Sequence, residues 1–378
     1  MKRILLAPDS FKGTLSASEI CQIQREAILA RLPDAVVHTL PLSDGGEGLT
    51  EALLRISGGR RVTLEVTGPL HTPVTGFYGI LPDGSAVIEM AAAAGLPLMG
   101  MRRDPLRATT RGVGELIRHA AEHGASRILL GLGGSATNDC GIGMAGALGY
   151  RFWDRDGHLV EPLAENLGKI ASLTPPEHPL NLEVVAACDV DNPLCGPEGA
   201  TRVFGPQKGV SPDLFPLLEE GMAHMARLME RSCGTDVGAC PGAGAAGGLG
   251  AGVLFFLGGR LRSGIDLLLD AVGFDHLLDR TDLVITGEGC MDAQSAHGKV
   301  PAGVGRRCKS RQVPCIAVCG SLGPGAEALY GCGISAMFST LRGFSDPDRV
   351  SATCREDLRF LTDSLLRTIL ALPQSLIP

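Results

Sequence analysis

Short apolar runs that end in glycine-marked polar loops recur along this chain, and they constrain its fold more than any other feature. Four of these runs are followed directly by an acidic residue: Asp9 after ILLAP, Asp44 after HTLPLS, Asp189 after VVAAC and Glu288 after LVITG. Ligands of α/β proteins bind beyond the carboxyl ends of parallel strands, so this pattern predicts an α/β fold with functional carboxylates at strand ends. For any one acid, a helix cap or turn residue remains the commoner role.

The two ends of the chain are predicted to form one open, mostly parallel sheet. RILLAP and VVHTLPL have strand character, and an amphipathic helix is predicted between them over residues 16–31. The last hundred residues have predicted strands at DLVITGEG, PCIAVCGS and AMFSTL, with predicted helices near 300–311 and 348–372. We expect a Rossmann- or flavodoxin-like α/β domain made of residues 1–66 and 276–378.

The middle of the chain has a different texture. VTGPLHTPVTGFYGILPDGSAVIEM alternates apolar and polar residues around a DG turn, which predicts antiparallel strands, and RFWDRDGHLV resembles a further hairpin. A chain of 378 residues exceeds the size of a single core. We therefore expect a second α/β domain, residues 67–275, inserted into the first and carrying the loop GGSATND, with the active site in the cleft between the domains.

Charge and composition exclude several classes of partner. The net charge is −7 and no run of five like charges occurs, so neither nucleic acid nor an anionic membrane is an expected partner. The apolar stretch Ile4–Ala7 is too short for a signal peptide, which predicts a cytoplasmic protein. The uncharged segment 237–259 is long enough to span a bilayer. Its nine glycines favour closely packed buried backbone instead.

Twelve cysteines are spread along the chain without a CxxC pair or a paired histidine motif. Neither a zinc site nor a disulfide framework is supported by this spacing. We interpret the cysteines as free thiols.

The segment Gly131–Gly143, GLGGSATNDCGIG, is the strongest single candidate for anion binding. It follows a predicted strand and opens a predicted helix, and glycine lets backbone amides approach a phosphate closely. We expect phosphate binding by Gly133, Gly134, Ser135, Thr137 and Asn138, and Mg²⁺ binding by Asp139. The structural alternative is a tight turn capped by Asn138 or Asp139.

The same segment also fits a loose dinucleotide pattern at Gly131, Gly133 and Ala136, with Asp154 as the ribose acid. That interpretation would make the protein a nicotinamide-dependent hydroxy-acid dehydrogenase. It is weakened by Asp139, whose carboxylate would face the pyrophosphate. A ligand sensor without catalysis is a further alternative, although no DNA-binding helix pair is visible.

Lysine is scarce, with six residues among 34 basic ones, and three of the six lie in glycine-flanked loops. These are Lys12, Lys208 and Lys299. A compact ammonium group suits neutralisation of a moving phosphoryl group, although solvated loop lysines are equally common. Lys299 ends GEGCMDAQSAHGK, which groups Glu288, Asp292 and His297 in a combination suited to a metal-bound polyphosphate.

Eight segments in order resemble the bacterial glycerate kinase family of the glycerate 2-kinase type. They are APDSFKGTLSA (7–17), DGGEG (44–48), VTGPL (66–70), AVIEMAAAAGL (86–96), GGSATND (133–139), ACDVDNPLCGPEGATRVFGPQKG (187–209), GAGAAGGLG (242–250) and VITGEGCMDAQSAHGKVP (284–301). The resemblance implies ATP and Mg²⁺ as cosubstrate and metal, and D-glycerate as the acceptor. It implies 2-phosphoglycerate as the product, with 3-phosphoglycerate as the alternative, and it allows a homodimer.

The motifs give each candidate residue an expected role in phosphoryl transfer. We expect Asp189, in preference to Asp9 and Asp44, to accept the proton of the acceptor hydroxyl. Lys12, Lys208 and Lys299 are the expected catalytic cations. The substrate-binding set then comprises Asp9, Ser10, Asp44, Gly45, Gly46 and Glu288 in addition to the residues of the glycine loop. The expected metal ligands are Asp139, Asp191 and Asp292.

Overall fold

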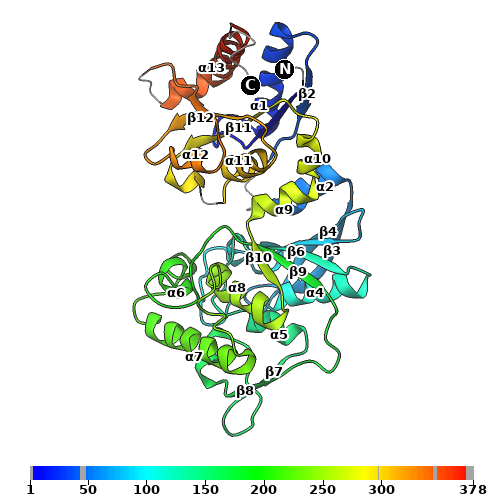
Figure 1. Cartoon of the computed structure of the whole chain (residues 1–378). Coiled ribbons are helices and arrows are strands. Elements are labelled where there is room, and N and C mark those ends of the chain that lie inside the picture. The colour runs from blue at the N-terminus through cyan, green and yellow to red at the C-terminus, as the bar shows by residue number, and fades with distance from the viewer. Residues whose placement is uncertain (1–2, 43–47, 297, 344–346, 372–378) are drawn as a thin grey trace. The chain divides into compact units, whose positions relative to one another are not determined.

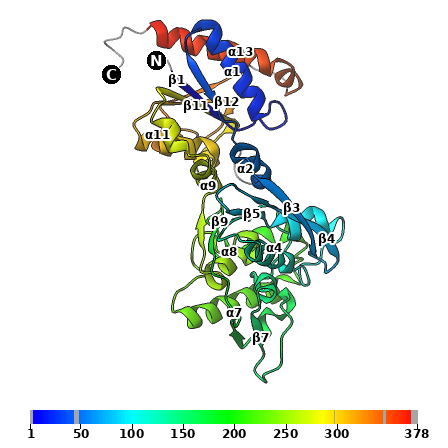
Figure 2. The same cartoon turned by 90° about the vertical axis from the view of Figure 1, so that its right-hand side faces the viewer.

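The computed structural model of the chain describes residues 3–42, 48–296, 298–343 and 347–371. The chain divides into two compact units (Figures 1 and 2). Unit 1 comprises Met1–Asp44 and Leu269–Pro378, and unit 2 comprises Gly45–Leu268. The predicted site residues Asp44, Gly45, Gly46 and His297 lie outside the described residues, so their roles stay predictions.

Unit 1 is built on a parallel sheet with the strand order β13-β12-β11-β1-β2. The strands are β1 (Arg3–Pro8), β2 (Val36–Thr39), β11 (Leu283–Met291), β12 (Cys315–Leu322) and β13 (Ala336–Ser339). Numbered within the unit, this is the flavodoxin-like order 2-1-3-4-5, whose strand order reverses between β1 and β11. The predicted α/β fold class is confirmed.

The helices of unit 1 cover both faces of this sheet (Figure 2). Helix α1 (Ala17–Arg31) begins where a capping box predicts it, because the Ser16 hydroxyl accepts the Glu19 N–H and the Glu19 carboxylate accepts the Ser16 N–H. It packs beside α13 (Pro347–Ala371). The other elements are α10 (Phe274–Leu278), the 3₁₀ turn η4 (Ala293–Ala296), α11 (Val300–Ser310) and α12 (Ala328–Gly331).

Unit 2 contains a mixed sheet with the strand order β10-β9-β6-β5-β4-β3. The strands are β3 (Arg60–Thr67), β4 (Pro73–Ile80), β5 (Ala86–Glu89), β6 (Arg127–Gly131), β9 (Glu183–Ala187) and β10 (Arg260–Arg262). Strands β3, β4 and β5 are antiparallel around the predicted DG turn, and the remaining pairs are parallel. The predicted hairpin near 151–160 is present as a short turn: an isolated bridge joins Trp153 to Leu159, the Asp154 N–H donates to the His158 carbonyl at 3.0 Å, and the Val160 N–H donates to the Phe152 carbonyl at 2.8 Å. Strand β7 (Arg151–Trp153) also pairs with β8 (Ser172–Thr174).

Helices of unit 2 surround this sheet with a core of Leu, Ile, Val, Ala and Met. They are α2 (Leu49–Ser57), α3 (Ala91–Ala94), α4 (Arg111–Glu122), α5 (Ile142–Ala147), α6 (Ala200–Phe204), α7 (Phe215–Cys233) and α8 (Ala245–Phe256). The 3₁₀ turns are η1 (Leu96–Met99), η2 (Ala164–Lys169) and η3 (Pro206–Lys208). Helix α9 (Gly264–Ala271) contains the division between the units.

The boundaries between the units differ from the expected ones near residues 66 and 276. The first division lies at residues 44 and 45, because β3 pairs along its whole length with β4 and therefore belongs to unit 2. Glu89 at the end of β5 also accepts the N–H groups of Gly48 and Thr50, which ties the start of α2 to the same sheet. The second division lies at residues 268 and 269.

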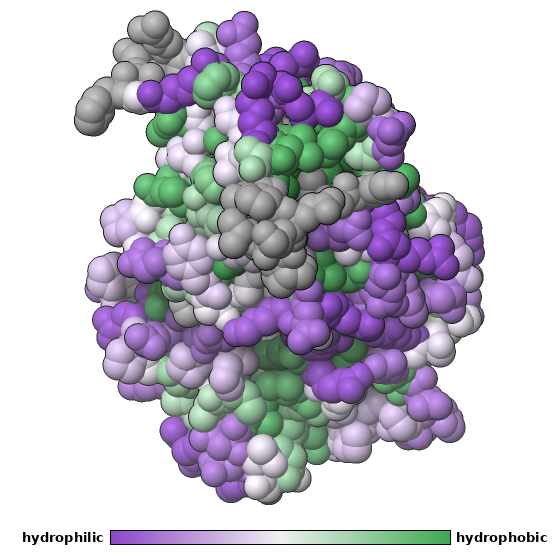
Figure 3. Space-filling view, turned by 45° about the horizontal axis from the view of Figure 1, so that its top comes forward, coloured by the Kyte–Doolittle hydropathy of each residue, from purple (hydrophilic) through white to green (hydrophobic). Residues whose placement is uncertain are grey.

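The glycine-rich segment at the start of α8 is packed backbone, as expected. Ala246, Gly247 and Gly248 have left-handed φ angles. A Cβ atom at Gly247 would lie 1.9 Å from the Thr137 carbonyl oxygen, so only glycine permits this approach. None of the helices among the described residues is both long enough and apolar enough to cross a membrane. Hydrophilic residues cover much of the face in Figure 3, with hydrophobic residues in smaller areas between them.

All twelve cysteines are free thiols, as the spacing predicts, and two of them, Cys233 and Cys290, are exposed. Burial raises the pKa of the Cys21 and Cys319 thiols to about 12.

Candidate functional site

Each unit contains one pocket formed at the carboxyl ends of its parallel strands. The pocket of unit 1 has a volume of about 650 Å³, and the pocket of unit 2 has a volume of about 410 Å³. Fifteen of the eighteen candidate residues are among those that the structure describes, and eleven of the fifteen line one of these two pockets.

The unit 1 pocket lies at the point where the strand order of the flavodoxin-like sheet reverses. Pro8 of β1 is in register with Gly287 of β11, and the Asp9 N–H continues the ladder by donating to the Gly287 carbonyl at 2.8 Å. Asp9 and Glu288 therefore stand on neighbouring strands, and both are nearly buried, with 7% of their surface exposed. Ser10 donates its N–H to Asp9 Oδ1 at 2.6 Å. Two of the four strand-end acids therefore line the same pocket.

Lys299 connects the acids of this pocket. Its Nζ lies 3.4 Å from Glu288 Oε2 and 3.9 Å from Asp292 Oδ1, and it donates to Ser295 Oγ at 3.4 Å. The other oxygen of Glu288, Oε1, is buried and has no hydrogen-bond partner among the described residues. Burial raises the pKa of Glu288, opposed by the Ser295 hydrogen bond and the positive charge of Lys299.

Local backbone geometry brings Lys12 and Lys299 to this pocket. Lys299 is the N-cap residue of α11, which begins at Val300 with Pro301 in its first turn. Gly289 allows the loop of Lys12 to approach β11, since a Cβ atom there would lie 3.1 Å from the Lys12 nitrogen. Lys12, Ser10 and Asp292 line the pocket together with Cys290.

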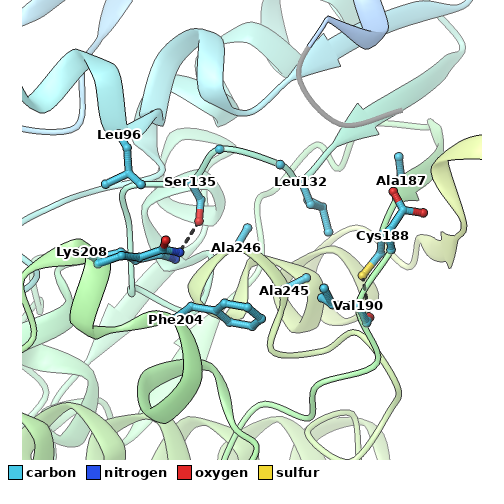
Figure 4. A pocket seen from close by; sticks show the side chains of 14 residues that line it. Leu96, Leu132, Ser135, Ala187, Cys188, Val190, Phe204, Lys208, Ala245 and Ala246 are labelled. Carbon is cyan, nitrogen blue, oxygen red and sulfur yellow. Dashed lines mark hydrogen bonds between the residues drawn. The ribbon is translucent and has the colours of Figure 1, made fainter. Parts of the chain in front are cut away.

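The unit 2 pocket combines a glycine loop with apolar walls (Figure 4). Gly133, Gly134 and Ser135 come from the loop after β6, and Asp189 comes from the loop after β9. Most of the remaining lining is apolar: Leu96, Leu132, Ala187, Val190, Phe204, Ala245 and Ala246.

Lys208 provides the cation of this pocket. Lys208 is 1% exposed, and its Nζ donates to Ser135 Oγ at 2.7 Å (Figure 4). The same Nζ also donates to the Thr137 carbonyl at 2.8 Å. An ammonium group has three donors, so one N–H remains for a ligand. Burial lowers the pKa of Lys208 to about 7, and the negative charge of Asp139 opposes this effect.

Asp139 does not have the geometry of the metal ligand that the sequence suggests. It is fully buried and lines neither pocket. Its Oδ2 accepts the N–H and the hydroxyl of Thr110, both at 2.8 Å, and its carboxylate also accepts the N–H groups of Gly141 and Gly143. The structure therefore favours the alternative role, in which Asp139 caps the start of α5.

Thr137 and Asn138 also differ from their expected role as phosphate-binding side chains. Both are completely buried and neither lines the pocket. Thr137 contributes its carbonyl to Lys208, and the Asn138 amide donates to Thr201 Oγ1 at 3.2 Å. Thr137 and Asn138 hold the loop in place, whereas Gly133, Gly134 and Ser135 are the loop residues that line the pocket.

Asp189 lines the unit 2 pocket, but it is exposed and its Oδ1 accepts the N–H of Gly264 at 2.8 Å, at the start of α9. Asp191 is exposed and lines neither pocket. One group of three metal-type side chains with ligand atoms within 4.8 Å occurs among the described residues, at Asp154, Asp156 and His158. It includes none of the three predicted metal ligands.

A comparison with protein families decides between the kinase and the dehydrogenase interpretations of the sequence. The model of the glycerate kinase family matches residues 4–370, nearly the whole chain. The chain belongs to the glycerate kinase family.

Individual relatives agree with this family assignment. The chain is 46% identical to a glycerate kinase of Bacillus subtilis (strain 168), covering 90% of this chain and 91% of the relative. It is 43% identical to the glycerate 2-kinase of Escherichia coli (strain K12), covering 92% of both chains. A crystal structure from Salmonella typhimurium LT2, provisionally described as glycerate kinase 2, is similar with a TM-score of 0.82, 41% identity and 98% coverage of both chains.

The family assignment and the geometry both argue against the dehydrogenase alternative. Helix α5 begins only at Ile142, so Gly131, Gly133 and Ala136 do not form the tight strand-to-helix turn of a dinucleotide site. Asp154 follows β7, which belongs to the separate two-stranded sheet.

Several residues that shape the glycerate kinase pockets were missed from the sequence. Thr110 anchors Asp139 from the start of α4, and Glu89 caps α2. Phe204 forms an apolar wall of the unit 2 pocket. Glu89 has a strand-end signal in AVIEM, whereas Thr110 and Phe204 carry no local signal that separates them from ordinary core residues.

The residues present fit the cosubstrate and metal that the family implies. The glycine backbone and the third N–H of Lys208 suit phosphate oxygens in unit 2. For a hard divalent cation, Asp292 is the only one of the three predicted ligands that lines a described pocket, and carboxylate oxygen is the donor that Mg²⁺ prefers.

Proposed function

We propose that this protein transfers the γ-phosphoryl group of ATP to D-glycerate and forms 2-phosphoglycerate. The observation that carries the proposal is the buried Lys208 beside the glycine loop of a chain that belongs to the glycerate kinase family. Phosphoryl transfer depends mainly on positioning and on neutralising negative charge. The buried ammonium group of Lys208 and two further lysines, Lys12 and Lys299, which line the unit 1 pocket, supply that neutralisation.

In this proposal the phosphates of ATP bind at Gly133, Gly134 and Ser135, next to Lys208. Lys12 and Lys299 neutralise charge on the transferred group from unit 1. We propose that the reaction takes place in a cleft between the two units, because an in-line transfer must bring the ligands of both pockets together. Mg²⁺, held by Asp292, would neutralise polyphosphate charge. We place the reaction in the cytoplasm, where ATP is plentiful.

The role of Asp189 as the base stays a prediction. Its Oδ1 already accepts the Gly264 N–H, and the side chain is exposed. These two properties favour a cap of α9 over a proton acceptor, and a comparison of turnover in Asp189→Asn and Glu288→Gln separates the two roles.

The decisive experiment is ³¹P NMR of the purified protein with D-glycerate and MgATP. We expect the ATP resonances to be replaced by those of ADP and 2-phosphoglycerate, with no product when D-glycerate is omitted. A 3-phosphoglycerate resonance would correct the position of transfer, and an unchanged spectrum would refute the proposed function.

A further inference from the structure

We infer that the pocket of unit 1 is the hydroxy-acid subsite and that Glu288 there accepts the proton of the hydroxyl group that is phosphorylated. This inference rests on the proposed function. It assigns the nucleotide to the pocket of unit 2.

The side chains that line the two pockets differ, and this difference indicates which ligand binds in each pocket. Both volumes exceed what a three-carbon acid needs, so size does not decide. The unit 1 pocket is rich in charged and hydroxyl groups, which suit a carboxylate and two hydroxyls: Asp9, Ser10, Lys12, Thr14, Glu288, Asp292, Lys299, Ser321 and Thr340. The unit 2 pocket has apolar walls that include Phe204, whose ring suits the face of a purine. Its charged side chains are only two, Lys208 beside the glycine loop and Asp189 on the loop after β9.

In the unit 1 pocket, the carboxylate of Glu288 has an oxygen atom that can accept a hydrogen bond from a ligand. Its Oε2 faces the Lys299 ammonium at 3.4 Å, while Oε1 is buried without a partner among the described residues. A buried carboxylate oxygen without a donor is costly unless a ligand supplies one. A substrate hydroxyl entering this pocket is such a donor.

The proton balance of the step is simple. The hydroxyl oxygen of the acid forms a bond to the γ-phosphorus of ATP, and its O–H bond breaks as the proton passes to Glu288 Oε1. The bond from the γ-phosphorus to the β,γ-bridging oxygen breaks, and ADP leaves with that electron pair. Lys299 lies beside Glu288 and stabilises the carboxylate before the transfer.

Burial also raises the pKa of Glu288, which brings it closer to the working pH of a general base. Titratable and charged groups face it from each neighbouring element. They are Asp9 and Lys12 after β1, Cys290 on β11, Asp292 after β11, Cys319 on β12 and Lys299 at the start of α11. Asp9 raises the pKa further through its negative charge.

Glu288→Gln tests the inference, because glutamine keeps the shape and can still contact a hydroxyl but cannot accept a proton. We expect kcat to fall about 10²–10³-fold, while the Kd values of D-glycerate and ADP by calorimetry stay within about threefold, well inside one tenfold step. The rise of kcat/KM with pH through the pKa of Glu288 should disappear. Glu356→Gln, an exposed residue of α13 in the same unit, is the matched control and should behave as wild type.

Other outcomes overturn the inference without touching the proposed function. Wild-type kcat in Glu288→Gln, or a loss confined to Asp189→Asn, would return the base role to Asp189. If Glu288→Gln does not fold by circular dichroism, Glu288→Asp replaces it. That variant withdraws the carboxylate by one methylene, so a kcat loss of at least about tenfold supports the inference and wild-type turnover overturns it. Wild-type protein without kinase activity would instead refute the proposed function.

Discussion

The two pockets occupy equivalent places in their sheets but are built by different means. In unit 1, side chains at strand ends supply almost every polar group, and the strand order of the sheet brings Asp9 and Glu288 together. In unit 2, the backbone of the glycine loop faces the pocket, and buried side chains such as Asp139 only hold it in position. We therefore expect substitutions in the unit 1 pocket to affect catalysis alone. Substitutions around the unit 2 pocket should also lower the free energy of unfolding.

The largest effect is expected for Lys208→Met, which removes the buried cation of unit 2. We expect kcat/KM to fall about 10²–10³-fold, as for other lost electrostatic contacts to a transferred group. Because the pKa of Lys208 is lowered to about 7, wild-type kcat/KM should decline as the pH rises through that value, and the variant should lack this decline. A steady-state coupled assay across pH measures both.

Lys309→Met is the control for this change, since Lys309 is exposed on α11 and contacts only the Gly331 carbonyl among the bonds described. Equal losses in both variants would show that Lys208 has no special role.

A smaller effect, on stability, is expected for Gly247→Ala in the packed segment of unit 2. Its φ is +67°, and the new Cβ atom would lie 1.9 Å from the Thr137 carbonyl oxygen, so the backbone must shift. We expect the free energy of unfolding in urea to fall by about 3 kcal/mol. Gly168→Ala is the control because it is exposed and has open space around it. Equal free energies of unfolding for the two variants would show that the stability of unit 2 does not depend on this close backbone contact.

The smallest effect is expected for Phe204→Ala. This substitution tests whether the nucleotide binds in the unit 2 pocket and the hydroxy acid in the unit 1 pocket. Loss of a stacking surface should raise the Kd of ADP about tenfold and leave the Kd of D-glycerate unchanged. Phe360→Ala, an exposed ring on α13, is the control. Calorimetry that shows weaker D-glycerate binding and normal ADP binding would reverse the assignment.

The sequence predicted unit 1 well because its strands are short apolar runs bounded by clear turn and cap signals. RILLAP, LVITG and the Ser16 capping box each determine their own local structure. The N-terminal boundary was misplaced because strand character in β3 does not reveal which sheet it joins.

Predictions for the glycine loop succeeded for its backbone and failed for some of its side chains. Gly133, Gly134 and Ser135 line the pocket as expected. Asp139 turns inward because Thr110, 29 residues earlier, provides two hydrogen bonds to it. A contact of that sequence separation depends on tertiary packing and leaves no local pattern.

The exposed thiol of Cys290 makes the unit 1 pocket accessible to chemical labelling. Only Cys233 and Cys290 are exposed among the twelve cysteines, and Cys290 alone of these two lines a pocket. Buried thiols with a raised pKa, such as Cys21 and Cys319, react slowly with alkylating reagents. After Cys233 is replaced by serine, the alkylation rate of the remaining exposed thiol becomes a direct readout of whether this pocket is filled, with no need to follow turnover.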